Sequence, residues 1–147
     1  MELTIERYQQ KKAFTLSRIY ETGRRKHWSM DVLEPPIMGM TDSRTATLNP
    51  GRYKLYLKPD KEECDIIACF QRISRNARFG FVPVVENVDV NNASFKSPCR
   101  MFTTSMLMGN YSAPDSQMKA SPEDFGHLMK LLVIAKQEKE IIFVNIK

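Results

Sequence analysis

Residues 101–110 read MFTTSMLMGN, and this stretch sets the organisation that we expect for the whole chain. It is apolar apart from three hydroxyl residues in a row at positions 103–105, and it ends at Gly109 and Asn110. The segments before it show the short alternating patterns of strands, whereas the segments after it contain one helical pattern. We therefore expect this stretch to be a central strand and the place where a functional site would lie.

The segments that precede this stretch alternate between apolar and polar residues, which is typical of half-buried strands. The second and third of them should pair as a hairpin across Gly23, because Gly readily adopts the positive φ of tight turns. The expected strands cover residues 3–8, 13–21, 28–32, 53–57 and 65–71, one or two more lie within 79–90, and a short one lies at 94–97.

The residues that follow the stretch begin with a turn-rich loop at 110–120 and then change period. Ser121 and Pro122 are typical of the first positions of a helix. Apolar residues at 125, 128, 129, 132 and 135 form one helical face. The sequence therefore predicts a helix over Pro122–Lys139 and a last strand over 141–146. The fold class is mainly β, with about eight mostly antiparallel strands and one long C-terminal helix in a single domain, 1–147.

The composition is that of an ordinary globular domain, with 42% hydrophobic and 27% charged residues in 147. The N-terminus has no apolar segment of a signal peptide, and no run reaches the roughly 18 apolar residues of a membrane helix. We therefore expect a cytoplasmic protein that does not engage a membrane. The spacing of Cys64, Cys69 and Cys99 fits neither a zinc site nor a disulfide framework, so we expect three reduced thiols, no metal and no cofactor.

The net charge of +5 is concentrated in the first part of the chain. Residues 1–58 hold 11 Lys and Arg against 6 Asp and Glu, whereas residues 59–147 hold 11 of each. The densest basic run, 24–28, ends in a tryptophan, and such a run can bind phosphate groups. A basic cluster at one hairpin tip is more typical of a solvated turn, and we do not expect nucleic acid to be the partner.

Several short motifs occur in an order that resembles a known family. They are Ile5-Glu6-Arg7, Phe14-Thr15-Leu16, Leu33-Glu34-Pro35, Leu48 to Leu55, Pro83 with Asn87-Val88, and Thr103 to Gly109. The family is a widespread domain of unknown function in small bacterial and phage proteins, and the resemblance covers nearly the whole chain. Its His…Gly…Thr-x-Gly-Cys motif resembles that of L,D-transpeptidases, in which a Cys thiolate activated by His attacks a peptide carbonyl. The resemblance implies a transpeptidase-like fold.

This sequence departs from the motif at the residues that carry the chemistry. Ser105 stands at the position of the Cys, and Thr104 stands at the position of the preceding Gly. The position of the His falls within residues 91–97, which contain no histidine. A serine hydroxyl is a weak nucleophile without an adjacent base. The departures indicate that the catalytic pair has been lost.

Two arrangements could restore a nucleophile and a base. His127 on the predicted helix could pair with Ser105, or Cys99 could act as a displaced nucleophile whose pKa is lowered by Arg100. His127 lies away from the centre of the apolar face, and Cys99 has no histidine nearby in sequence. Ser105, Cys99 and His127 are the candidate catalytic residues, but we expect none of them to catalyse a reaction.

The favoured hypothesis is a non-catalytic pseudoenzyme that binds a peptide, a glycan or another protein. Hydroxyl, amide and guanidinium groups suit such ligands, since they hydrogen-bond amides and carboxylates. The expected ligand-binding residues are Arg100, Thr103, Thr104, Ser105 and Asn110. Two alternatives stay open: an acyl transferase or amidase with relocated catalytic residues, and a structural protein of a phage or mobile element.

Overall fold

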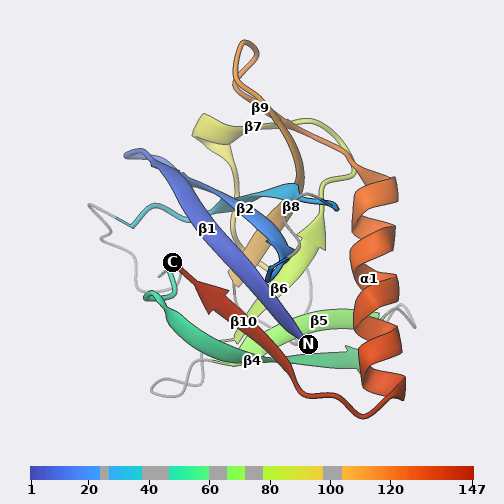
Figure 1. Cartoon of the computed structure of the whole chain (residues 1–147). Coiled ribbons are helices and arrows are strands. Elements are labelled where there is room, and N and C mark those ends of the chain that lie inside the picture. Colours follow the sequence, from blue (N-terminus) through green and yellow to red (C-terminus); the bar gives the residue numbers. More distant parts are fainter. Residues whose placement is uncertain (24–26, 38–46, 60–65, 72–77, 98–103) are drawn as a thin grey trace.

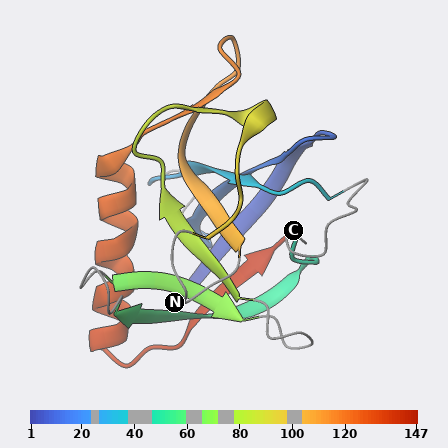
Figure 2. The same cartoon turned by 180° about the vertical axis from the view of Figure 1, so that it is seen from behind.

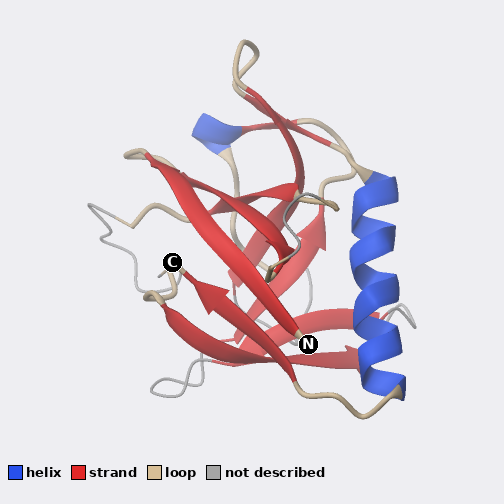
Figure 3. Cartoon of the chain, in the orientation of Figure 1, coloured by secondary structure: helices blue, strands red, loops and turns tan. Residues whose placement is uncertain are grey.

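The computed structural model describes residues 1–23, 27–37, 47–59, 66–71, 78–97 and 104–147, and for residues 59, 66–71 and 78 it describes the backbone alone. Strands dominate these residues, and one long helix, α1 (Pro122–Gln137), lies near the C-terminus (Figure 3). The predicted mainly β fold with a single C-terminal helix is confirmed. The other elements are β1 (Glu2–Gln10), β2 (Thr15–Glu21), β3 (Met30–Glu34), β4 (Gly51–Pro59), β5 (Ile66–Gln71), β6 (Arg78–Pro83), β7 (Val88–Asp89), the 3-10 helix η2 (Val90–Asn92), β8 (Thr104–Ser112), β9 (Gln117–Lys119) and β10 (Ile142–Ile146).

The sheet curls into a closed ring of strands. Its strands are hydrogen-bonded side by side in the order β3-β2-β1-β10-β4-β5-β6-β8, and β8 also pairs with β3, which closes the ring. The described pairs are antiparallel except for β1 with β10 and β6 with β8, which are parallel. Because β10 inserts between β1 and β4, the last strand of the chain lies beside the first (Figure 1).

The inside of the ring is filled by apolar side chains that alternate with outward-facing residues along each strand. In β1, for example, Leu3 and Ile5 are fully buried in this cluster. The helix α1 lies beside the ring (Figure 1, Figure 2) and adds Leu128, Leu132 and Ala135 to the same cluster. Burial of this face holds the helix in place.

A second apolar cluster covers the outer face of β2, β3 and β8. Leu16 and Leu33 point into it from the ring, and Val84, Val90 and Phe95 cover it from the segment between β6 and β8. Both faces of these three strands are therefore largely buried, and several of the buried residues are polar. We call the described part of the segment between β6 and β8, residues 84–97, the covering segment.

The strand β8 extends beyond its predicted end. Gly109 and Asn110 lie within the strand, and the turn follows at residues 113–116 before β9. A Cβ at Gly109 would lie 2.2 Å from the carbonyl oxygen of Lys119 in β9. The predictions that the strand ends at Gly109 and Asn110 and that residues 110–120 form a loop were wrong, because β8 runs to Ser112, β9 follows, and Gly109 allows the close approach of that strand.

The sequence predicts nearly full burial of five residues, Leu55, Ile67, Leu107, Leu132 and Val144, and Leu107 departs from this prediction. Met106 and Met108 point into the ring and are 1% exposed, whereas Leu107 lies on the opposite face of β8 and is only partly buried. Its predicted near-complete burial was wrong, because strand parity places it at the outer cluster. Of the other four, Leu55, Leu132 and Val144 are buried, and Ile67 lies among the residues whose side chains are not described.

Smaller differences concern the ends of elements. Trp28 precedes β3, and residues 94–97 form one isolated bridge, Lys96 with Thr104, instead of a strand. On α1, Phe125 and Met129 are only partly buried against the ring cluster. The helix ends at Gln137, two residues before its predicted end.

Candidate functional site

Ser105, at the position of the family's nucleophile, is buried within β8. Its side chain is 1% exposed, and its hydroxyl donates a hydrogen bond of 3.3 Å to the carbonyl oxygen of Lys96. Its backbone N–H donates to the carbonyl of Phe95 at 2.9 Å. The covering segment therefore accepts hydrogen bonds from both the hydroxyl and the backbone N–H of Ser105. The serine joins β8 to that segment.

His127 lies in a different environment. It is exposed on α1, and its ring contacts the ring of Trp28 edge-on, with centroids 5.5 Å apart. The helix packs against the cluster that contains Met106, and Ser105 points to the other face of β8 because neighbouring side chains alternate. Among the described residues, no hydrogen bond joins Ser105 to His127.

The remaining predicted site residues are placed as follows. Thr104 is 2% exposed, so its side chain is buried like that of Ser105. Asn110 is exposed near the C-terminal end of β8, where it pairs in register with Lys119 of β9. Cys99, Arg100 and Thr103 lie outside the described residues. The ligand-binding role of this set stays a prediction.

A buried polar cluster lies inside the ring. Arg7 and Glu34 form a salt bridge at 3.0 Å, with side chains that are 3% and 1% exposed. Arg7 also donates to the carbonyl of Leu48 at 2.7 Å, and the hydroxyl of Ser17 donates to Glu34. The charges are paired and hydrogen-bonded, as burial requires, so this cluster has the properties of a structural support.

A second polar group lies on the outside of the same strands. The hydroxyl of Tyr8 and the guanidinium of Arg18 both donate to one oxygen of Asp31, at 3.1 Å and 3.2 Å. The other oxygen accepts the backbone N–H of Tyr111 at 2.8 Å. Burial of the Tyr8 phenol raises its pKa well above its usual value. The negative charge of Asp31 and the hydrogen bond from the Tyr8 hydroxyl to Asp31 act in the same direction.

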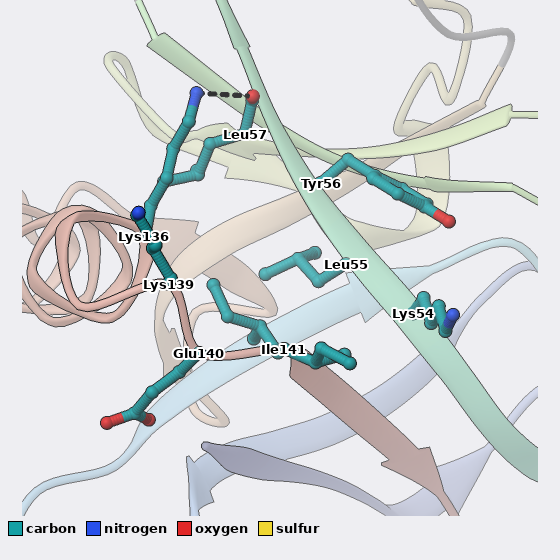
Figure 4. Close-up of a pocket in the computed structure, with 9 residues that line it drawn as sticks. Lys54, Leu55, Tyr56, Leu57, Lys136, Lys139, Glu140 and Ile141 are labelled. Carbon is teal, nitrogen blue, oxygen red and sulfur yellow. Dashed lines mark hydrogen bonds between the residues drawn. The ribbon is translucent and has the colours of Figure 1, made fainter.

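A pocket of about 350 Å³ lies where the end of α1 and the start of β10 meet β4 (Figure 4). In Figure 4 the side chains of Leu55, Leu57, Lys136 and Lys139 lie on one side of β4, and those of Lys54 and Tyr56 point to the other side. The residues that line it are Lys54, Leu55, Tyr56, Leu57, Lys136, Lys139, Glu140, Ile141 and Ile142.

Sequence reasoning did not find this pocket. Lys136 and Lys139 are recognisable in sequence as cations at a helix end, which is a common structural feature. The alternation in β4 predicts that Lys54 and Tyr56 share its outer face. No local signal, however, brings β4 beside the residues that precede β10, because that pairing joins distant parts of the chain.

No group of His, Cys, Asp and Glu side chains in the described part of the chain could hold a metal ion. Over the same ranges, no helix is both long enough and apolar enough to span a membrane. Comparison with known proteins found no matching family model, no matching curated protein and no matching solved structure.

Proposed function

We propose that this protein is a non-catalytic binding module, derived from an L,D-transpeptidase-like fold, that holds a peptide, a glycan or another protein without covalent chemistry. The observation that carries the proposal is the state of Ser105. Its side chain is 1% exposed, and its hydroxyl is hydrogen-bonded to the Lys96 carbonyl. A nucleophile must reach the substrate carbonyl, and this hydroxyl is covered.

The chemistry of the motif supports the same proposal. A general base contributes roughly 10²- to 10⁴-fold to such a reaction, and an imidazole also raises the reactive thiolate fraction in the family's Cys–His pair. Here Ser105 replaces the thiol, and the only two histidines are His27 and His127. The described contact of His127 is with Trp28. A transpeptidase reaction would therefore lack both the thiolate nucleophile and the histidine base.

Incubation with tetrapeptide muropeptides, followed by chromatography of the products, tests the proposal. We expect no hydrolysis and no cross-linked product above the rate in buffer, for the protein and for a Ser105→Ala variant alike. The same muropeptides should give saturable shifts in an NMR titration if the ligand is a peptidoglycan peptide. Turnover that Ser105→Ala abolishes would instead establish an enzyme and overturn the proposal.

A further inference from the structure

We propose that the pocket between the end of α1 and β4 binds a carboxylate that is attached to an apolar body. The inference rests on the proposed binding function, and it names a site and a ligand class for it. The pocket is separate from Ser105, which lies on the outer face of β8 under residues 95–96.

The positive charge at the rim is not neutralised within the pocket. Lys54 and Lys139 form no ion pair with any carboxylate among the described residues. Lys136 donates one hydrogen bond, of 3.1 Å, to the carbonyl of Leu57 (Figure 4). An ammonium group has three donors, so two remain for a ligand. In Figure 4 the Lys136 ammonium lies on the α1 side of β4, whereas the side chains of Lys54 and Tyr56 point to the other side, so the donors for an anion come from Lys136 and Lys139.

The acidic residue at the rim does not offset these charges. The carboxylate of Glu140 points away from the pocket in Figure 4 and lies 3.2 Å from the N-terminal ammonium of Met1. The backbone carbonyls at the end of α1 are also occupied, since the N–H groups of Glu138, Lys139 and Glu140 bond to carbonyls at residues 134–136. The negative end of the helix is thereby partly satisfied, as in a Schellman motif.

The backbone holds Lys139 at the rim in an unusual conformation. Its φ is +59°, in the left-handed region where helices normally place glycine after their last turn. A non-glycine residue is strained there. Strained residues often lie at binding sites, where the side chain is needed in one position. Here the left-handed backbone places the start of the Lys139 side chain at the pocket rim.

The apolar residues of the pocket and its volume indicate what the uncharged part of the ligand would be. Leu55 is buried below the pocket, and Ile141 is 58% exposed at its edge. A volume of about 350 Å³ is near the lower limit of small-molecule sites. The site therefore fits a small apolar acid or the last residue of a peptide with a free carboxyl group.

An NMR titration of the isotope-labelled protein with four probes tests the proposal. Two are acids, acetyl-leucyl-phenylalanine and 4-phenylbutyrate, and two are the corresponding primary amides. We expect at least one acid to bind about tenfold or more tightly than its amide, with shifts at Lys54, Tyr56 and Ile141. The tighter acid distinguishes a peptide end from a small organic acid. Equal binding of each acid and amide, no saturable shift, or shifts confined to other residues would overturn the proposal.

Matched variants separate the charges in the pocket from charge in general. Lys136→Gln and Lys139→Gly should each weaken binding of the acid about tenfold, and Lys130→Gln, at an exposed position of α1, should leave it unchanged. Lys139→Gly should also raise the melting temperature, so lost affinity cannot be attributed to unfolding. Unchanged acid affinity in Lys136→Gln and Lys139→Gly would refute the pocket. Muropeptide binding that persisted in those variants would leave the proposed function standing with a different site.

Discussion

The guanidinium of Arg7 donates two hydrogen bonds to the carboxylate of Glu34 inside the ring of strands. The Nε–Oε2 distance is 3.2 Å, and the Nη2–Oε1 distance is 3.0 Å. Arg7 lies on β1 and Glu34 at the end of β3, and Ser17 on the intervening β2 donates to the same carboxylate. The pair therefore joins three neighbouring strands through buried charges.

Removing one partner of this pair should strongly destabilise the fold. Arg7→Met leaves the Glu34 carboxylate buried without its cation, and such changes cost about 3–5 kcal/mol. The double variant Arg7→Met/Glu34→Gln should lose less than the sum of the single changes, because the second change removes the orphaned charge. Urea unfolding of the four proteins measures this coupling. A loss below about 1 kcal/mol for Arg7→Met would contradict a structural role.

The two glycines Gly109 and Gly126 should respond in opposite ways to alanine. A Cβ at Gly109 would clash with the Lys119 carbonyl, so Gly109→Ala should cost about 3 kcal/mol or more. At Gly126, on α1, the added Cβ would meet nothing within 4 Å, and Gly126→Ala should stabilise by about 0.5–1 kcal/mol. Thermal and urea unfolding measure both effects. Equal effects of the two changes would show that β9 does not approach β8 as described.

Lys139→Gly should stabilise the protein. The left-handed conformation of Lys139 carries a cost of about 1–2 kcal/mol that glycine avoids. Part of this gain is lost because glycine has more freedom in the unfolded chain, so a net gain of about 1 kcal/mol is expected. Lys136→Gly, within the helix, is the control and should destabilise by about the same amount. A lower melting temperature for Lys139→Gly would argue against the positive φ.

The Tyr8 hydroxyl should lose its proton at a higher pH than an ordinary phenol does. Because the pKa of Tyr8 is raised in the folded protein, the folded state retains a proton that the unfolded state loses above about pH 10. Its contribution to stability is therefore unchanged below that pH and declines as the pH rises further. Solvent screening limits the size of this effect, since Tyr8 is 48% exposed.

Absorbance titration of phenolate tests this statement against Tyr8→Phe. The variant should lack absorbance change from the last part of the titration, above the range in which exposed tyrosines ionise. Tyr56→Phe, at a similarly exposed position, is the control. If Tyr8→Phe removed absorbance change near pH 10 instead, the contact with Asp31 would not govern this phenol.

The sequence predicted most of the long strands and the helix, because these have local signals, whereas β9 lies within residues that were expected to form a loop. The alternation in β2 and β3 and the turn at Gly23 predicted their hairpin, and Ser121 and Pro122 located the start of α1 within one residue. The closure of the ring had no such signal. The pairs β1 with β10 and β3 with β8 join strands that are far apart in the chain, and alternation identifies the buried face of a strand without identifying its partner.

The candidate site was less predictable for the same reason. The hydroxyl residues Thr104 and Ser105 were visible in the sequence, but their burial depends on the segment between β6 and β8. The described part of that segment, residues 84–97, has only β7 and η2 as regular elements, and Val84, Val90 and Phe95 pack it into the outer cluster. The pocket beside α1 likewise depends on the distant pairing of β10 with β4.

The central claim is that Ser105 is a covered structural residue in a protein that forms no acyl-enzyme. Intact-protein mass spectrometry after prolonged incubation with an acylating β-lactam tests it most directly, with Ser105→Ala as the reference. We predict no added mass on Ser105, and no difference between the two proteins in the mass that incubation adds. An adduct of one β-lactam that peptide mapping places on Ser105, and that Ser105→Ala lacks, would contradict the account.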